Sequence, residues 1–379
     1  MVYIGYGIAL PVLPFFLETR VGGVEGFSVS WHTGMVTGIF MFTLFAFAPL
    51  WGRLSDRIGR RPVILIGLGG CVVALVSFAI VKNLWLGYLA RALGGAMVSA
   101  VLPVALAYIG DISSRTTRAH HFARISAAGT LGFLVGPVIG GWLSGITLST
   151  NIAGVDSMSF PFLVSAAAGS LVWIAVYLWL PEPSVSSQTV PIAADSRNSL
   201  VGPTNSLLVL ALFGMFGLGS FEVAIALQSQ QALNLNPFQI GLLFMECSLM
   251  MVVGQVLLFA RLVRHFSFRL VVIPAMLLMA VGLALFPIAS HFTLIILAVG
   301  LVGIGSGVLI PILAYQSSLH ANRSQGAVLG KQTAAVSLGQ GLGSAAAGGL
   351  FAIASQAPFW SSAGLLVVGA LLGLRVGRV

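Results

Sequence analysis

The sequence predicts an all-α integral membrane protein whose twelve transmembrane helices form two pseudo-symmetric six-helix bundles. Three observations predict this fold: the composition, twelve long apolar runs and an internal repeat. Of the 379 residues, 58% are hydrophobic and 7% are charged, whereas an average soluble domain carries roughly 25% charged residues. A water-soluble protein of this size could not bury so much apolar surface. We therefore expect the chain to lie in a lipid bilayer.

Twelve apolar runs are long enough to cross a membrane, since a helix needs about 20 such residues to do so. They cover residues 1–17, 33–52, 62–81, 84–109, 125–145, 160–180, 206–228, 239–260, 269–289, 291–316, 328–353 and 358–375. The first run is short, begins at Met1 and contains two prolines. It leaves open whether residues are missing before Met1.

The basic residues predict the orientation. With a cytoplasmic N-terminus, 15 of the 18 Lys and Arg residues fall in the inner loops and tail, and two, Arg20 and Lys82, in outer loops. This asymmetry is the signature of the positive-inside rule. We expect a multi-pass protein of the plasma membrane (the inner membrane of a bacterium) with both termini in the cytoplasm. Because the basic residues are sorted by membrane side, the net charge of +9 does not indicate nucleic-acid binding.

A polar stretch divides the chain. Residues 181–205 form the longest hydrophilic segment and are rich in Pro and Ser, as linkers are. The predicted organisation is an N-terminal six-helix bundle (1–182), a cytoplasmic linker (183–205) and a C-terminal six-helix bundle (206–379).

The two halves also match each other in sequence. At an offset of 207 residues, Gly132, Gly136 and Gly141 correspond to glycines at 339, 343 and 348, and Arg124 corresponds to Lys331. A looser match, between 51–67 and 259–274, needs a slip of one residue. Chance similarity between Gly- and Ala-rich helices explains one such match but not several in order. A parallel repeat of this kind is typical of transporters, with the substrate site between the halves.

Two motifs resemble those of a known family. The segment "GRLSDRIGRRP" at 52–62 resembles the loop 2–3 signature of the major facilitator superfamily, and "GFLVGPVIGG" at 132–141 resembles the helix 5 motif of its antiporters. Arg91 matches the family's helix 4 arginine, and "GYGIALPVLP" at 5–14 resembles helix 1 of the drug:proton antiporters that include tetracycline exporters. The residues that fill the two motifs are Gly52, Asp56, Arg57, Gly59, Arg60 and Arg61, then Gly132, Gly136, Pro137, Gly140 and Gly141.

The sequence departs from that family at two places. Many of the drug antiporters carry an acidic residue where this chain has Val2, so proton coupling through helix 1 is not expected. The second copy of the loop motif, at 261–269, keeps its basic residues but lacks the Asp and both glycines.

The resemblance gives the loop motif a role. In the family, the Asp of the motif meets the inner end of helix 11, here near 330–333, and its basic residues bridge to an Asp at the inner end of helix 4, here Asp111. This contact clamps the halves on the cytoplasmic side while the cavity faces outward. We expect an Asp56–Arg60–Asp111 cluster that acts as a conformational latch.

The helix 5 glycines have two interpretations. Gly132, Gly136 and Gly140 recur every four residues and share one face of a helix, where small residues allow close helix packing in lipid. They serve either as plain packing or as a sliding contact between the halves, and the resemblance favours the second. Pro137 removes one backbone hydrogen bond and permits a kink.

Three charged residues lie well inside the predicted spans. Arg91, Glu222 and Glu246 each lie about 10 Å below the outer surface at a rise of roughly 1.5 Å per residue, which predicts a polar layer in the cavity. A carboxylic acid that alternates between wet and dry surroundings can carry a proton, and Glu222 is favoured because the resemblance places helix 7 at the cavity. Gln340 either contacts substrate or bonds a neighbouring helix.

The motifs argue against other classes of protein. The sequence contains no H-E-x-x-H, G-x-S-x-G, C-x-x-C or P-loop motif, so neither an enzyme nor an ATP-driven pump is expected. It shows no filter-like loop of a channel. We expect a monomeric secondary transporter, without metal or cofactor, that exports a small amphipathic organic compound or drug by proton antiport. The alternative is proton-coupled uptake of a small metabolite.

Overall fold

The computed structural model describes residues 1–21, 28–113, 118–146, 157–182, 203–319 and 325–376. Every regular element in these ranges is helical. The first half contains α1 (Val2–Val21), α2 (Val29–Ile58), α3 (Arg60–Ile80), α4 (Leu84–Ile112), α5 (Arg118–Ser144) and α6 (Phe160–Trp179). The second half contains α7 (Pro203–Gln231), α8 (Pro237–Val253), η1 (Gly254–Phe259), α9 (Ala260–His265), α10 (Phe268–Leu285), η2 (Phe286–Ile288), α11 (Phe292–Leu319), α12 (Gln325–Ile353) and α13 (Ala357–Val376).

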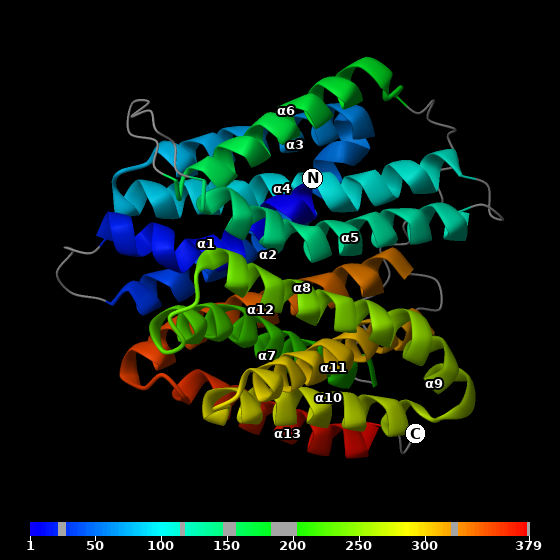
Figure 1. Ribbon diagram of the computed structural model, residues 1–379. Coiled ribbons are helices and arrows are strands. Elements are labelled where there is room, and N and C mark those ends of the chain that lie inside the picture. Colours follow the sequence, from blue (N-terminus) through cyan, green and yellow to red (C-terminus); the bar gives the residue numbers. More distant parts are fainter. Residues whose placement is uncertain (22–27, 114–117, 147–156, 183–202, 320–324, 377–379) are drawn as a thin grey trace.

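Twelve of the segments in the described ranges are long and apolar enough to span a membrane, which confirms the predicted number of spans. Most of the proposed linker, residues 183–202, lies outside the described residues. In Figure 1, α1–α6 form the upper half of the molecule and α7–α13 the lower half.

The halves repeat the same packing. In the first, α3 packs against α4 and α6, and α1 against α5; in the second, α10 packs against α11 and α13, and α7 against α12. Close helix approach accompanies this pattern: Gly132 and Gly136 of α5 lie against Ile4 of α1, while Gly339 and Gly343 of α12 lie against Leu212 and Phe216 of α7. The two pseudo-symmetric six-helix bundles expected from the sequence are therefore confirmed.

The one-residue slip in the repeat has a structural cause. The first half has an uninterrupted helix of 30 residues, α2. Its counterpart is α8, which passes into the π-helix η1 before continuing as α9. A π-helical turn holds one more residue than an α-helical turn, as an insertion requires. Upstream of η1 the repeat follows an offset of 207, and in the segment directly after it, where Arg53 corresponds to Arg261 and Arg61 to Arg269, the offset is 208. Further along the chain, from Arg124 and Lys331 onward, it is 207 again.

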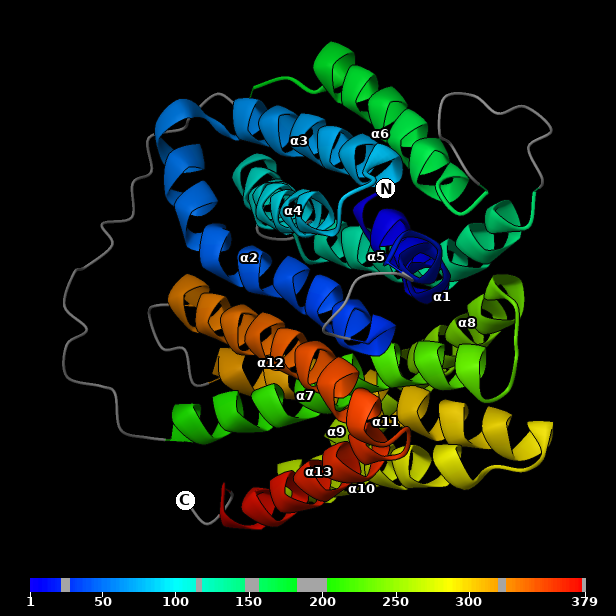
Figure 2. The same cartoon turned by 90° about the vertical axis from the view of Figure 1, so that its left-hand side faces the viewer.

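The molecule has two distinct ends. We call the "basic end" the one where α2 passes into α3, which carries Arg53, Arg57, Arg60 and Arg61. The "opposite end" is the one where α1 leads to α2. Figure 2 looks onto the opposite end and shows α2 beside α12 at the boundary between the halves.

At the opposite end the halves touch through backbone atoms. A Cβ on Gly34 of α2 would lie 2.7 Å from the Cα of Gly348 on α12, and one on Gly141 of α5 would lie 2.6 Å from the Cα of Phe238 on α8. At the basic end, in contrast, Gly52 of α2 and Gly330 of α12 have no atom within 4 Å of the corresponding position. The contact between the halves therefore closes at the opposite end.

Candidate functional site

One buried carboxylate lies where the two halves meet. Glu222 belongs to α7 and is 3% exposed. It accepts a hydrogen bond of 2.7 Å from the Tyr6 hydroxyl of α1. The Gln340 side-chain amide of α12 donates to both carboxylate oxygens, at 3.1 and 3.0 Å, and lies 3.3 Å from the Tyr6 hydroxyl. These three side chains, the "junction triad", connect the first half to the second.

Aromatic rings hold Tyr6 in place. Its ring stacks on Phe40 of α2 at 5.5 Å between centroids and on Phe133 of α5 at 6.1 Å. On the same helix as the carboxylate, Leu218 and Phe221 are buried in the hydrophobic core. A carboxylate in such apolar surroundings requires hydrogen bonds, and the junction triad supplies them. If Glu222 accepts a proton it loses its negative charge, and its hydrogen bonds with Tyr6 and Gln340 become weaker.

Sequence reasoning singled out Glu222 and Gln340 but missed Tyr6. The signal was present, because a buried tyrosine hydroxyl nearly always has a hydrogen-bond partner. The sequence does not reveal which face of α1 turns toward α7, and therefore could not name that partner.

Arg91 shares a cavity with Tyr6 but forms no hydrogen bond with the junction triad among the described residues. Its side chain is buried, and its guanidinium carbon lies 5.2 Å from the ring centroid of Phe40 and 5.3 Å from that of Phe78. Among the described residues it forms no ion pair with Glu222. It lines a small cavity inside the first half, together with the ring of Tyr6.

Glu246 occupies a third position. It is half-buried on α8, and its Oε1 lies 3.1 Å from where a Cβ on Gly300 of α11 would be. Its Oε2 has no hydrogen-bond partner among the described residues. The polar layer expected from depth alone is thus divided: Glu222 and Gln340 meet, whereas Arg91 and Glu246 each lie against other helices.

The loop motif forms a linked cluster at the basic end. Arg60 bonds Asp56 in an ion pair, donates from Nε to Asp111 at 3.0 Å, and donates to Ser55 Oγ at 2.6 Å. The Asp56 side chain is 59% exposed. Asp56, Arg60 and Asp111 all belong to the first half, so in this conformation the cluster joins α2, α3 and α4 to one another. Arg57 is exposed beside it.

A second acid organises the turn of this motif. Glu182 accepts from the backbone N–H groups of Arg60 and Arg61 at 2.8 and 3.2 Å, which is where α3 begins. A carboxylate is favourable at a helix N-terminus because the first N–H groups lack partners in the helix. Gly59 has a φ of 100°, and a Cβ there would meet the Glu182 carboxylate. The positive φ and the nearby carboxylate together explain why position 59 is a glycine.

The helix 5 motif is used differently from the expectation. Gly132, Gly136 and Gly140 face α1 in the same half. In this conformation these three glycines pack within their own half. Four-residue spacing identifies a face but not the helix that covers it. Gly141 and Pro137 make that contact instead, with Phe238 and Gly241 of α8 respectively.

Side chains add two bonds between the halves at the opposite end. Gln230 of α7 donates to Glu18 Oε2 of α1 at 2.7 Å. Gln231 donates to Ser30 Oγ of α2 at 3.3 Å. They lie on the side where the glycine contacts are, so backbone packing and hydrogen bonds close the same end.

Comparison with known proteins agrees with this geometry. The sequence model of the Major Facilitator Superfamily matches residues 1–219 and 207–378. The chain belongs to the major facilitator superfamily. It is accordingly a multi-pass plasma-membrane protein and a transporter of small molecules, as expected from the sequence.

Two relatives among the curated proteins cover nearly the whole chain. Quinolone resistance protein NorA of Staphylococcus aureus (strain COL) is 27% identical over 379 residues, which is 99% of this chain and 93% of the relative. Multidrug resistance protein 2 of Bacillus subtilis (strain 168) is 25% identical and covers 99% of this chain and 91% of the relative.

Solved structures share the fold. A D-xylose-proton symporter superposes with a TM-score of 0.79 at 17% identity, covering 98% of this chain and 94% of that one. A bacterial homologue of the human lysosomal transporter Spinster, in an inward-facing and occupied conformation, gives a TM-score of 0.78 at 16% identity, with 100% and 94% covered.

Proposed function

We propose that this transporter exports small amphipathic organic compounds, drugs among them, by proton antiport with alternating access. The observation that carries the proposal is the junction triad, in which a buried carboxylate of the second half is bonded to a hydroxyl of the first. The names of the two relatives, which concern quinolone and multidrug resistance, support a drug as the exported compound.

The junction triad suggests how a proton changes the conformation. Ionised, Glu222 holds Tyr6 and Gln340 by charge-assisted hydrogen bonds, each of which contributes about 1.5–3 kcal/mol. Protonation removes the charge and weakens these bonds, so the link between α1 and α7 loosens. Glu222 is therefore the proton carrier in this proposal, and Gln340 and Tyr6 transmit its state to the two halves. Glu246 remains a second candidate, because one of its oxygens has no partner among the described residues.

The orientation follows from charge. With a cytoplasmic N-terminus the sequence assigns 15 of the 18 basic residues to the inner loops and tail. The passage from α2 to α3 at the basic end carries Arg53, Arg57, Arg60 and Arg61, so the positive-inside rule assigns this end to the cytoplasm. The contact between the halves closes the opposite end, so the conformation described here is open to the cytoplasm and ready to load substrate. The Asp56–Arg60–Asp111 cluster is then the unlocked form of a latch that grips α12 when the transporter turns outward.

Export is tested with everted membrane vesicles, in which the cytoplasmic face is outside. Vesicles whose lumen is more acidic than the medium should accumulate norfloxacin, and an uncoupler should abolish this accumulation. Glu222→Gln should remove the response to the gradient while the protein stays inserted, and Glu246→Gln, which tests the second candidate, should keep it. If norfloxacin left the vesicles instead, the direction would be uptake; normal coupling in Glu222→Gln would reject the proton carrier.

A further inference from the structure

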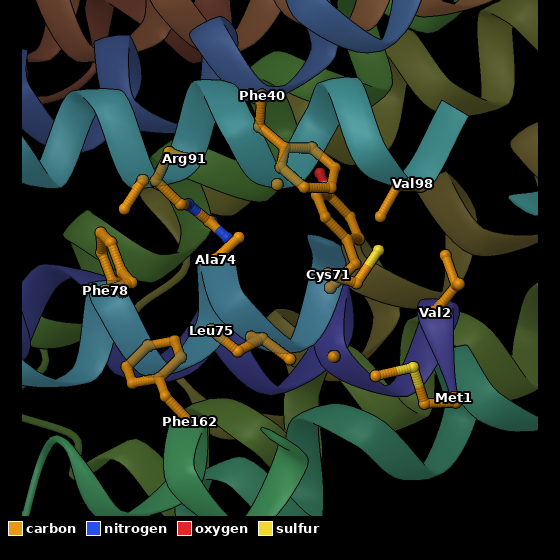
Figure 3. A pocket seen from close by; sticks show the side chains of 14 residues that line it. Met1, Val2, Phe40, Cys71, Ala74, Leu75, Phe78, Arg91, Val98 and Phe162 are labelled. Carbon is orange, nitrogen blue, oxygen red and sulfur yellow. The ribbon is translucent and has the colours of Figure 1, made fainter. Parts of the chain in front are cut away.

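The first half contains a small cavity whose walls are mostly apolar. It has a volume of about 40 Å³ and lies between α1, α2, α3, α4 and α6. Figure 3 shows Arg91 pointing into it, with Phe78 on one side and Phe40 on the other. Arg91 carries the only charged side chain among the residues that line this cavity. A cationic group in an apolar cavity is costly unless it finds a partner.

The guanidinium of Arg91 has unused donors. The residue is 5% exposed, and its Nε and Nη2 have no hydrogen-bond partner among the described residues. The rings of Phe40 and Phe78 lie within cation–π distance. A ring attracts the cation through its π face, whereas the N–H bonds lie in the guanidinium plane and need acceptors there. Stacking therefore leaves both donors unsatisfied.

The two unused donors have a specific geometry. Nε and Nη2 form one edge of the planar guanidinium, and their N–H bonds point in parallel. Two parallel donors of this kind match the two oxygens of a carboxylate. The carboxylate of Glu222, already bonded to Tyr6 and Gln340, does not fill this edge. No described residue supplies an acceptor to this edge, which leaves it free to bind a group from outside the chain.

The walls indicate what is attached to that carboxylate. Phe78 and Phe162 meet edge to face at 5.0 Å, and the ring of Tyr6 lines the same cavity. Aromatic walls favour an aromatic ligand. The cavity is too small for a drug-sized molecule, since such sites have volumes of about 300–1,000 Å³. It fits the acidic end of a ligand, and through Tyr6 it shares a wall with the junction triad.

We propose that Arg91 and the aromatic walls of this cavity form a subsite for the carboxylate end of amphipathic aromatic acids. The inference rests on the proposed function and deepens it, because it names aromatic monocarboxylates as a class of substrate. The carboxylate and Arg91 form the anchor, and the rings of Phe40 and Phe78 lie within cation–π distance of the guanidinium.

Equilibrium binding to the purified full-length chain in lipid nanodiscs tests the subsite. At pH 7.5 and without a pH gradient, 2-naphthoate should bind about tenfold more tightly than 2-naphthamide, which has the same shape but no charge, as expected for a hydrogen bond between charged groups. Arg91→Met should abolish this preference, and Arg91→Lys should keep part of it because the charge remains without the paired donors. Lys82→Met, on the exposed surface, is the control and should bind like the wild type.

Several results would overturn the proposal. Equal affinity of the wild type for 2-naphthoate and 2-naphthamide would mean that the cavity holds only water, of which its volume admits two or three molecules. Tighter, Arg91-dependent binding of laurate would mean that a fatty acid is the ligand. If Arg91→Met fails to fold, the affinities of the wild type and of Arg91→Lys for 2-naphthoate and 2-naphthamide still test the subsite.

Ligand binding at Arg91 and proton-coupled export are measured separately, so either one can fail without the other. In Glu222→Gln, the preference for 2-naphthoate should persist because the Arg91 edge is unchanged, while transport driven by the pH gradient should be lost. Wild-type protein that shows coupled export of norfloxacin but binds 2-naphthoate and 2-naphthamide equally well would reject the subsite alone.

Discussion

Tyr6 of α1 and Glu222 of α7 share a 2.7 Å hydrogen bond although 216 residues separate them. At the repeat offset of 207, Glu222 corresponds to Phe15 and Gln340 to Phe133. The two halves thus have the same helix packing, but the acid and the amide of the second half have no polar counterparts in the first. The first half instead supplies the Tyr6 hydroxyl, which donates a hydrogen bond to the acid.

Tyr6→Phe should slow proton-coupled export about tenfold, because Glu222 loses a charge-assisted hydrogen bond while the ring stacking on Phe40 remains. The measurement is the initial rate of norfloxacin accumulation in everted vesicles at a fixed pH gradient. Tyr108→Phe is the matched control, since Tyr108 also donates one hydrogen bond, to the Pro181 carbonyl of its own half. Equal losses in both variants would show that Tyr6 only supports folding.

Gly34→Leu should prevent closure of the opposite end, because its Cβ alone would lie 2.6 Å from the carbonyl oxygen of Ser344. We expect transport to be lost and a cysteine placed at Ser30 to be labelled by an impermeant thiol reagent from outside the cell. Gly364→Leu is the control, since no atom lies within 4 Å of that position. Unchanged labelling would contradict the assigned closure.

The contact of Glu18 with Gln230 predicts a cross-link. Because the contact joins the tips of two long side chains, whereas a direct disulfide needs Cα atoms within about 7 Å, the Glu18→Cys/Gln230→Cys double variant is treated with a short bis-methanethiosulfonate cross-linker, which forms a disulfide with each cysteine. The cross-link should join the halves and stop transport, and a reductant should restore it. The native Cys71 and Cys247 are buried and should not interfere. Transport that continues in the cross-linked protein would show that this end does not need to open.

Asp56→Asn should shift the transporter toward the conformation open to the cytoplasm, because the proposed latch loses its charge. The ratio of inner to outer labelling of single cysteines measures this shift. Arg53→Gln removes an exposed charge one turn away and should leave the ratio unchanged. A ratio that does not move in Asp56→Asn argues against the latch.

Gly59→Ala should destabilise the protein by about 1–2 kcal/mol, since a side chain is unfavourable at a positive φ and Glu182 occupies the space. Thermal unfolding of the purified protein measures the loss. Gly110→Ala, where no atom lies within 4 Å, should unfold like the wild type or at a slightly higher temperature. Equal behaviour of the two variants would show that the turn relaxes without cost.

The sequence was informative where a property depends on the chain alone. Hydropathy identified the twelve spans, and the 207-residue offset identified the repeat that places α7 and α12 as α1 and α5 are placed. Contacts between elements were harder to predict. Periodicity put Gly132, Gly136 and Gly140 on one face but could not tell whether α1 or the other half covers it. Depth alone grouped Arg91 with Glu222, although the rotation of each helix about its axis turns the two side chains to different neighbours.

The π-helix η1 explains how a membrane helix accommodates a change of length. One added residue in an α-helix rotates everything beyond it by about 100°, the angle between successive residues at 3.6 per turn. In this chain the wider turn at Gly254–Phe259 takes up the extra residue, so that the loop after α9 still leads into α10 where α2 leads into α3. Insertions at such a point are tolerated because the helical positions on either side, Cys247 before the turn and Arg261 after it, need not rotate about the helix axis. Length variation among homologues should therefore concentrate at this turn.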